Sequence, residues 1–505
     1  MKKTALLLFL ALFWVTYAQC QTSNQLTKDQ SDILAKAYRY EKNGWIFLHI
    51  EGKPVERGFQ HGYLLAKEIQ ENLRLLKARW IYLHIEGSPR ERGYQHGWLM
   101  ATEIKENLRL LRTRWEYQTA IDWSWYVKNA REILSVRVDA ENLEEIDGIV
   151  EGMRTAGVET SRDELVALNG YAELMGSWWP TVKDSVHSHS TEQPKESCSS
   201  FIATGSMTAN GKIVLGHNTM DLYNNPMCNL ILDILPDKGH RILMQSVAGF
   251  VHSETDFFIT DAGLVGSETT IGDFFPFDPK GTPEFSRMRH ATQYASSIDE
   301  WCDIMKKDNN GGYANAWLLG DINTNEIARL ELGLKYIGFE KKKEGYFIGS
   351  NVAEDLKILR FETKKDETNI KYSSIARRVR WKQLMKEYAG KINIKRAEAF
   401  EADHYDSYLK KNNPGGRTLC GHWEIDPQPF GPSIPYSPEG TLDGKVVDAA
   451  MAKQMSFVAR WGSACGRAFD GEKFLKEHPQ YDWLTGMLKS RPSQPWTVFK
   501  AGERK

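Results

Sequence analysis

The residues most able to do chemistry stand in the stretch from Glu196 to Asp221, where Cys198 is followed by the pair His217 and Asn218. If the chain is cut just before Cys198, that residue gains a free α-amine beside its own thiol. An α-amine titrates near pH ~8 and a thiol near ~8.5, so the amine can take the thiol's proton at working pH. This stretch therefore predicts a self-activating amide or ester hydrolase. A buried strand cysteine is the competing interpretation.

The segment before Cys198 is predicted to be a linker. Residues 181–197 are short of apolar side chains and rich in Ser, Thr, His and charge, which is typical of an exposed, flexible segment. His187 and His189 have no acidic or cysteine partner at ligand spacing, so we interpret them as solvated and expect no metal. No cofactor is expected either, because the sequence has no glycine-rich nucleotide loop, HExxH motif or GxSxG elbow.

In residues 198–505 the pattern changes to strands separated by helices. An Asn210-Gly211 hairpin signal joins the first two strands. Helices are predicted over Ser286–Lys307 and Ala376–Ala389, and a looser tail begins at Asn413. Strands are predicted at residues 201–204, 213–216, 230–235, 241–247, 257–260, 264–270, 316–319, 327–332 and 346–349. This order indicates an α+β sandwich with antiparallel sheets, and no linker divides this part of the chain.

The start of the chain predicts export. Residues 1–18 combine two lysines, a short apolar run and a small-residue end, which is typical of a secretory signal. The mature protein is therefore expected to be secreted or periplasmic. Cys20 stands where a lipid-anchored protein carries its acylated cysteine, but Gln19 is a poor residue before such a site. Residues 21–44 form an N-terminal extension, and no later stretch approaches the roughly 20 apolar residues of a membrane span.

Two adjacent blocks, residues 45–79 and 80–114, are near copies that match at 25 of 35 positions. Each predicts a short strand (Ile46–Ile50 or Ile81–Ile85), a Gly-x-Pro turn and a helix. Two copies are too few for a solenoid, so we interpret them as a local duplication within a globular fold. The second copy runs directly into further helical sequence, so we expect it to hold the structural position and the first to be an accessory.

Residues 80–180 are predicted to form a mainly helical N-terminal part. Apolar residues recur at helical spacing from Trp123 to Gly176, and Asp139 and Ser161 are candidate N-caps. His61 and His96, one in each copy, are assigned structural roles, because a lone histidine is a weak catalytic signal.

Composition and cysteine content narrow the class of partner. The chain has 65 Lys and Arg against 66 Asp and Glu, so no global field recruits nucleic acid. Six cysteines are few for an exported chain, and none forms a CxxC pair, which argues against a zinc ribbon or a thioredoxin-type site. Cys420 and Cys465 are predicted to form a disulfide.

Several short motifs occur in a characteristic order. They are Cys198-Ser-Ser, Gly216-His-Asn-Thr219, residues 263–272 (GLVGSETTIG), Tyr313-Ala-Asn-Ala-Trp317 and residues 404–409 (HYDSYL). In this order they resemble the phospholipase B-like family of N-terminal-nucleophile hydrolases. The stretch from Gly87 to Gly97 is also similar to the related penicillin acyltransferase family. The resemblance implies a four-layer αββα fold and self-cleavage at the nucleophile, with two chains produced from one precursor.

The resemblance also implies roles for single residues. Cys198 would be the nucleophile and its α-amine the base, and the Asn315 side chain would donate to the developing oxyanion. His217 and Asp221 would orient the amine or a water molecule. Hydrogen bonds in the same pocket would come from Thr269 and Thr270. An arginine is also expected near the nucleophile. Arg377 and Arg378 are the candidates for it, and we choose Arg378.

The leading hypothesis is an exported, self-processed hydrolase that cleaves the amide or ester bond of an acylated small molecule or lipid. Acyl transfer from the same Cys198 thioester is the alternative among enzymes. A non-catalytic lipid-binding protein with this fold is the alternative outside enzymes. The sequence leaves the acyl chain, the head group and the oligomeric state open.

Overall fold

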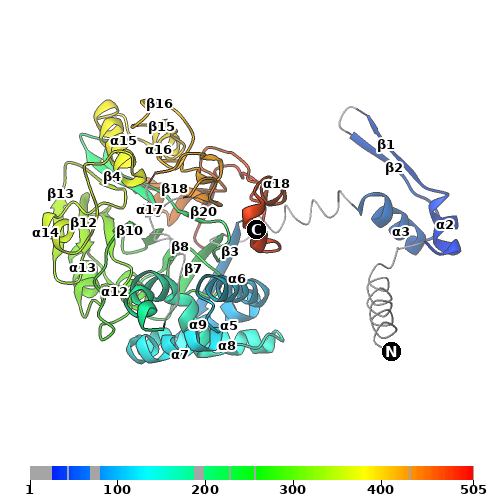
Figure 1. Ribbon diagram of the computed structural model, residues 1–505, viewed down its shortest axis with the longest axis horizontal. Coiled ribbons are helices and arrows are strands. Elements are labelled where there is room, and N and C mark those ends of the chain that lie inside the picture. The colour runs from blue at the N-terminus through cyan, green and yellow to red at the C-terminus, as the bar shows by residue number, and fades with distance from the viewer. Residues whose placement is uncertain are drawn as a thin grey trace, which may run out of the picture. The chain divides into compact units, whose positions relative to one another are not determined.

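The computed structural model describes residues 26–42, 45–66, 68, 80–186, 198–226, 229–254, 257–430 and 434–503. The chain divides into two compact units at residue 77 (Figure 1), and each is described by itself. The predicted export signal, Cys20 and residues 187–197 of the predicted linker lie outside the described residues. Within the described ranges, no helix has the length and apolar character needed to cross a membrane.

The small unit contains the first copy of the duplication. It begins with α2 (Lys28–Leu34), and β1 (Tyr38–Lys42) pairs antiparallel with β2 (Trp45–His49). A turn with Gly52 at φ +105° leads into α3 (Pro54–Leu64). The strand and turn predicted for this copy are thus confirmed, and so is the predicted helix over α3; the rest of that helix, in residues 69–79, lies outside the described residues.

The second copy is part of the large unit. Its strand, β3 (Ile81–Gly87), pairs in parallel with β7 (Leu230–Pro236), and its helices are α5 (Pro89–Leu99) and α6 (Ala101–Thr119). Helix α5 crosses α8 (Ala140–Thr155) at glycines, so that a Cβ added to Gly97 would lie 2.1 Å from the carbonyl oxygen of Ile149. The second copy thus contributes to both a sheet and the helical layer.

The predicted helical segment is present and extends further than expected. Helices α7 (Trp123–Ile133), α8 and α9 (Arg162–Asn169) follow one another, and Asp139 and Ser161 cap α8 and α9 as predicted. The chain continues through α10 (Tyr171–Glu173), a π-helical turn (Leu174–Trp178), α11 (Trp179–Val182) and η3 (Lys183–Val186). Residues 181–186, predicted as flexible linker, are therefore helical.

One sheet of the large unit has eight strands in the order β13-β12-β11-β10-β9-β8-β7-β3. The expectation of purely antiparallel sheets is wrong at one edge, because the pairing of β3 with β7 is parallel. The bounds of the other strands are β8 (Ile242–Ser246), β9 (Phe257–Thr260), β10 (Leu264–Thr270), β11 (Asn315–Asp321), β12 (Glu326–Leu332) and β13 (Ile337–Lys342).

A second sheet has six strands in the order β14-β4-β5-β18-β19-β20. They are β14 (Gly345–Gly349), β4 (Ser199–Gly205), β5 (Gly211–Asn218), β18 (Asp443–Asp448), β19 (Ser456–Trp461) and β20 (Thr497–Lys500). The last three lie in the segment that the sequence predicts to be a looser tail, so that prediction is wrong for these residues. In β18 two charged residues face the interior, so the strand lacks the apolar alternation by which strands are recognised. Short pairs join β15 (Tyr405–Asp406) to β16 (Lys411–Asn412) and β17 (Glu439–Thr441) to β6 (Met220–Leu222).

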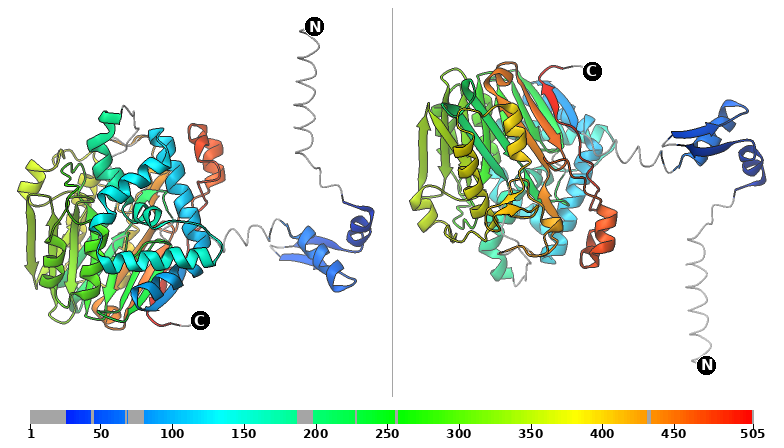
Figure 2. Two further views of the ribbon diagram at one scale, coloured as in Figure 1. Left: turned by 90° about the horizontal axis from the view of Figure 1, so that it is seen from below. Right: turned by 90° about the horizontal axis from the view of Figure 1, so that it is seen from above.

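The two sheets share a core of alternating side chains. Ile202 of β4 lies among residues of both sheets, whereas Phe201 and Ala203 point to the other side, against α15 (Ser373–Glu387) and α16 (Ile394–Glu401). The outer face of the eight-stranded sheet is covered by α6 to α9, α12 (Glu284–Tyr294) and α13 (Ile298–Lys306), as Figure 2 shows. The fold is therefore mixed α/β.

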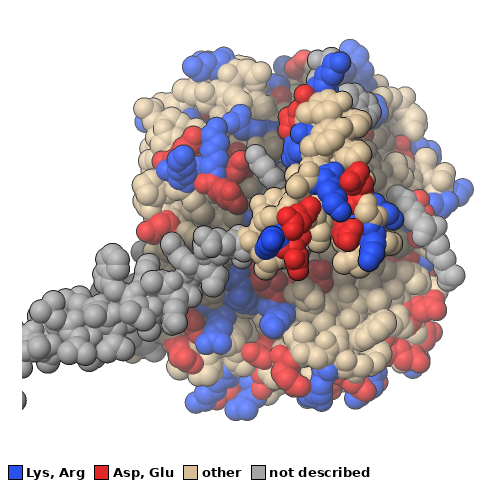
Figure 3. All heavy atoms as spheres, turned by 90° about the vertical axis from the view of Figure 1, so that its right-hand side faces the viewer, with Lys and Arg blue, Asp and Glu red and all other residues tan. Residues whose placement is uncertain are grey.

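The helices differ from the prediction in number and bounds. The single helix predicted over Ser286–Lys307 is two helices, because Ser297 caps the start of α13. The remaining helical elements are η1 (Ser135–Arg137), α14 (Leu356–Phe361), η4 (Trp423–Ile425), α17 (Ala449–Lys453), α18 (Gly471–Glu477) and η5 (Pro479–Leu484). On the face drawn in Figure 3, basic and acidic side chains are interspersed, in keeping with the balanced charge of the sequence.

Candidate active site

Cys198 stands directly before β4, at the end of a strand that lies between β14 and β5. Its side chain is buried and its backbone has φ +80°. Burial raises the pKa of the thiol well above its usual value, and the negative charge of Glu268 adds to that shift. A hydrogen bond from the backbone N–H of Met220 and the positive charge of Lys445 oppose it. The thiol is therefore neutral in the uncut chain.

Arg377 holds the backbone of Cys198. Its guanidinium is buried and donates from Nη1 to the Cys198 carbonyl oxygen at 2.6 Å and from Nη2 to Oδ1 of Asn351 at 2.7 Å. Asn351 in turn donates from Nδ2 to the carbonyl oxygen of Thr270 at 2.8 Å. A chain of hydrogen bonds, of which the two from Arg377 are charge-assisted, thus joins Cys198 to the end of β10.

Arg378, the arginine chosen from the sequence, has a different partner. Its guanidinium forms an ion pair with Glu354, with Nε 2.6 Å from Oε1. Consecutive residues of a helix point about 100° apart, so only one of the two arginines of α15 can face the nucleophile. The structure brings Arg377, and not Arg378, into contact with Cys198.

Asn315 opens β11 and lies opposite Thr270 of β10. Its side chain is buried, and neither its amide nitrogen nor its oxygen has a hydrogen-bond partner among the described residues. The hydroxyl groups of Thr269 and Thr270 are also buried without a partner in the described part of the chain. An unsatisfied buried polar group costs about 1 to 3 kcal/mol, so Asn315 and Thr270, which share a strand face, are well placed to bind a polar ligand, whereas Thr269 points to the opposite face, toward Gly349.

His217 joins the two sheets. It lies opposite Ser200 on β4 and Lys445 on β18, and its Nε2 donates to the carbonyl oxygen of Glu268 at 3.0 Å. Burial lowers the pKa of His217 well below its usual value, and the charge of Lys445 lowers it further. The ring is therefore neutral and carries its proton on Nε2, because a carbonyl oxygen can only accept.

Asp221 lies on the short strand β6. Its Oδ1 accepts a hydrogen bond from the backbone N–H of Leu222 at 2.8 Å, and its Oδ2 accepts one from the side chain of Asn225. Its negative charge is among those that raise the pKa of Cys198. Its predicted role in orienting the amine or water stays a prediction, as does that of His217.

A buried ionic pair near the cysteine was not foreseen. Lys445 and Asp443 are both buried, with Nζ 2.7 Å from Oδ1, and Lys445 also donates to Oγ1 of Thr219 at 2.6 Å. Gln245 completes the network by donating from Nε2 to Asp443 at 2.6 Å. Residues 443 and 445 share a strand face because side chains alternate along a strand, which is the one local signal that could have revealed the pair.

A cavity of about 430 Å³ lies beside the end of β10. Thr270 is part of its wall, together with Tyr313, whose hydroxyl donates to Oε1 of Glu268 at 2.9 Å. The wall combines apolar and cationic side chains: Met175, Trp179, Phe274 and Phe275 on one hand, Arg114, Lys183 and Lys364 on the other. The cavity can therefore hold a molecule that is apolar in one part and anionic in another.

The predicted Cys420–Cys465 disulfide is wrong. Both residues are free thiols, as are Cys198 and Cys302. Cys420 and Cys465 each lie within hydrogen-bonding distance of His422 instead, so an interaction with a histidine takes the place of the expected bridge.

The model of the Phospholipase B family matches residues 38–337, so the chain belongs to that family. The matched range includes Cys198, His217, Asp221 and Asn315 and ends before Arg377. The resemblance stated from the sequence motifs is thereby confirmed at the level of the family.

Individual relatives are more distant. An uncharacterised protein of Archaeoglobus fulgidus is 26% identical over 281 residues, which cover 53% of this chain and 40% of the relative. Putative phospholipase B-like 2 of Bos taurus is 37% identical over 89 residues, 16% of this chain and 15% of the relative. Phospholipase B of Crotalus adamanteus is 24% identical over 274 residues, 49% of this chain and 46% of the relative. In each case the chain spans less than half of the relative's length.

Proposed function

We propose that this chain is an exported hydrolase that cuts itself before Cys198 and then uses Cys198 to cleave the ester or amide bond of an acylated small molecule or lipid. The observation that carries the proposal is the conformation of Cys198: a buried thiol at a strained backbone position, held through its carbonyl by Arg377. Membership of the Phospholipase B family and the names of its relatives support a lipid substrate.

Backbone strain at Cys198 favours cleavage. A residue other than glycine held at φ +80° costs about 1 to 3 kcal/mol, and such residues cluster at functional sites. The torsion φ describes rotation about the N–Cα bond of Cys198 and takes the carbonyl carbon of Ser197 as its first atom, so breaking the bond between Ser197 and Cys198 removes the constraint.

Self-processing needs only the groups of this chain and one water molecule. The Cys198 sulfur attacks the Ser197 carbonyl carbon, the C–N bond breaks, and the nitrogen leaves as the Cys198 α-amine with the thiol's proton. Water then hydrolyses the thioester, which yields a Ser197 carboxylate and restores the thiol. The product has a free amine beside the nucleophile, as an N-terminal nucleophile requires.

Turnover repeats the same chemistry on a substrate. The α-amine takes the thiol's proton, sulfur attacks the acyl carbon, and the Asn315 amide N–H donates to the developing oxyanion, a contact worth about 3 kcal/mol in other enzymes. The leaving group departs with the proton, and water hydrolyses the acyl-thioester. Arg377 keeps the Cys198 backbone in place throughout, because it binds the carbonyl and not the thiol.

The cavity beside Thr270, whose wall includes neither Cys198 nor Asn315, would suit an amphipathic substrate. Its aromatic side chains suit an acyl chain, and its three cationic side chains suit an anionic head group such as a phosphate. The layers follow one another in the order helices, eight-stranded sheet, six-stranded sheet and helices. This order supports the four-layer fold of N-terminal-nucleophile hydrolases.

Intact mass spectrometry of the purified protein tests the proposal. We expect two fragments from the wild type, the heavier beginning at Cys198, and one uncut chain from Cys198→Ala. Cys302→Ser is the matched control, since Cys302 is a buried free cysteine in α13, and it should be cut normally. A wild type that stays uncut and does not hydrolyse phospholipid or N-acyl substrates would overturn the proposal.

A second variant tests the role of the buried amide. Asn315→Ala should lower the hydrolysis rate by about 10² to 10³ without changing the unfolding temperature much, because the side chain makes no hydrogen bond within the described residues. Unchanged hydrolysis in this variant would remove Asn315 from the mechanism.

A further inference from the structure

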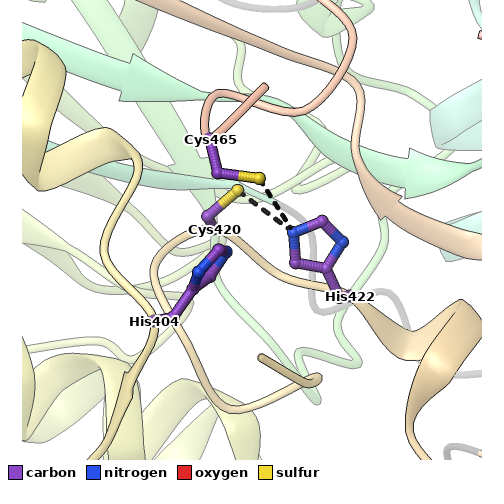
Figure 4. Close-up of side chains that lie close together, drawn as sticks. All are labelled: His404, Cys420, His422 and Cys465. Carbon is purple, nitrogen blue, oxygen red and sulfur yellow. Dashed lines mark hydrogen bonds between the residues drawn. The ribbon is translucent and has the colours of Figure 1, made fainter. Parts of the chain in front are cut away.

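Four side chains from distant parts of the sequence converge outside the candidate active site. His404, Cys420, His422 and Cys465 point toward one another, and one potential ligand atom from each lies within 4.8 Å of all the others (Figure 4). His404 lies between α16 and β15, Cys420 and His422 lie in the loop between β16 and η4, and Cys465 follows β19.

The distances fit a tetrahedral metal centre. The sulfur atoms of Cys420 and Cys465 are each 3.4 Å from Nε2 of His422. In a tetrahedral zinc site with zinc–sulfur bonds of about 2.3 Å and zinc–nitrogen bonds of about 2.0 Å, sulfur and nitrogen ligands lie about 3.5 Å apart. The observed separation therefore matches the one that a shared ion would impose.

Outer contacts orient the ligands. Nδ1 of His422 is 2.8 Å from Oε1 of Glu424, and both side chains are buried. A carboxylate on the far nitrogen of a histidine fixes the ring and leaves Nε2 free to bind a metal, as is usual in zinc sites. Nε2 of His404 is also buried, and the His404 imidazole interacts with the Cys465 thiol, a second ligand of the cluster.

We propose that His404, Cys420, His422 and Cys465 bind one zinc ion in a structural Cys₂His₂ site. Two thiolates and two imidazoles in a tetrahedral set select zinc over the harder cations Mg²⁺ and Ca²⁺. Four protein ligands close the coordination sphere, which is typical of structural rather than catalytic zinc. Binding releases the two thiol protons to solvent.

The ion would fasten a loop that supports the candidate active site. In that loop, the carbonyl oxygen of Gly416 accepts from Ser373 at 2.6 Å, and that of Leu419 accepts from the Asn218 side chain at 2.9 Å. Ser373 also accepts a hydrogen bond from Arg377, the residue that holds Cys198. The zinc site thus stabilises the support of the nucleophile without touching it. All four ligands lie beyond residue 337, where the family match ends.

Metal content of the purified full chain is the decisive measurement. Protein produced in zinc-supplemented medium and dialysed should contain about one zinc per chain by elemental mass spectrometry. Cys420→Ser and Cys465→Ser should each lose at least 90% of it, while Cys302→Ser should keep it. A metal-free wild type, or equal loss from Cys302→Ser, would overturn the proposal.

Two measurements on the wild type keep the test decisive if the serine variants do not fold. Cys420 and Cys465 should resist alkylation until a chelator is added, and cobalt exchanged for zinc should give the intense absorption of a tetrahedral thiolate site. Peptide mapping that finds a Cys420–Cys465 disulfide in the purified protein would contradict the proposal. These readouts do not depend on cleavage at Cys198, so the zinc site and the proposed hydrolase can fail separately.

Discussion

The two copies of the duplication have nearly the same sequence and the same local structure but very different surroundings. In each, a glycine with φ near +100° (Gly52 at +105°, Gly87 at +102°) turns the chain from a strand into a helix of 11 residues that begins with proline. In each, an arginine of the helix donates back to the carbonyl of that glycine. The 35-residue block thus encodes the strand, the turn and the helix by itself.

Burial separates the copies. His96 of the second copy is buried and accepts a hydrogen bond from the backbone N–H of Gly249 at 3.0 Å, whereas the equivalent His61 is exposed. Gly97 lies against the backbone of α8, whereas a Cβ at Gly62 would meet no atom of the described residues within 4 Å. Two nearly identical sequences thus differ in burial, because the elements that pack against the second copy come from the chain that follows it.

The largest effect is expected at the crossing of α5 and α8. Gly97→Ala places a Cβ against the Ile149 carbonyl and should lower the free energy of unfolding of the large unit by about 3 kcal/mol or more, since the backbones must separate. Gly62→Ala, the same change in the first copy, should leave the large unit unchanged and stabilise α3 by up to about 1 kcal/mol. Urea unfolding of both variants measures the difference; equal effects would show that the copies are not distinct.

The second-largest loss of stability is expected from replacing the buried arginine of the second copy. Arg92 is buried and binds Glu145, with Nη2 2.8 Å from Oε2. Arg92→Met should cost about 3 kcal/mol, at the low end for a broken buried pair, because Arg289 still neutralises Glu145. Arg57→Met in the first copy removes an exposed side chain and should cost less than about 0.5 kcal/mol in the same urea titration. A small loss from Arg92→Met would argue against the buried position of α5.

A smaller, pH-dependent effect is expected at His96. Burial and the charge of Arg289 lower the pKa of His96 to about 4. The unfolded chain, with an ordinary histidine pKa near ~6.5, binds more protons than the native state between these values, so the stability falls as the pH falls through this window. The large unit should lose about 2 kcal/mol from this residue between pH 7 and pH 5.

His96→Gln should flatten that dependence, and His61→Gln should leave it unchanged, which thermal melts across the pH range will measure. His252, whose pKa burial lowers to about 3, remains in both variants, so some loss of stability below pH 6 should persist. Identical pH profiles for wild type and His96→Gln would contradict the assignment of a buried neutral His96.

The smallest effect is expected from removing the first copy. Deletion of residues 45–79 leaves β3, α5 and every residue of the candidate active site in place. Cleavage before Cys198 and the melting temperature of the large unit should both stay at wild-type values, as measured by intact mass and calorimetry. Loss of folding would show that the first copy holds the structural position instead.

Local patterns predicted most of the fold. All nine strands predicted from apolar runs are present, because short-range alternation and turn residues mark strands that are buried on at least one face. The strands that the sequence did not predict contain charged residues, as β13 and β18 do, or lie in the Pro-rich tail, as β20 does. The parallel pairing of β3 with β7 joins segments about 150 residues apart, and no local signal specifies such a partner.

For the candidate active site, too, local patterns do not specify contacts between distant parts of the sequence. Cys198, Asn315 and the threonines of β10 stand in recognisable motifs, and the pairing of β10 with β11 places Asn315 opposite Thr270. The roles of Arg377 and Asn351 depend on contacts with segments far away in the sequence. The sequence alone could therefore not show which of Arg377 and Arg378 contacts Cys198. The proposed zinc ligands span residues 404 to 465, and the close spacing of Cys420 and His422 is a local signal that the sequence analysis did not use.

The parallel pair of β3 and β7 has a consequence for a chain cut at Cys198. Strand β3 precedes the cut and β7 follows it, so one continuous sheet would be built from two polypeptides. Unfolding would then separate two molecules, and its midpoint would rise with protein concentration. Refolding would require the halves to find each other again in solution. The precursor would be the form that folds, and the cut product would persist only as long as its halves stay together.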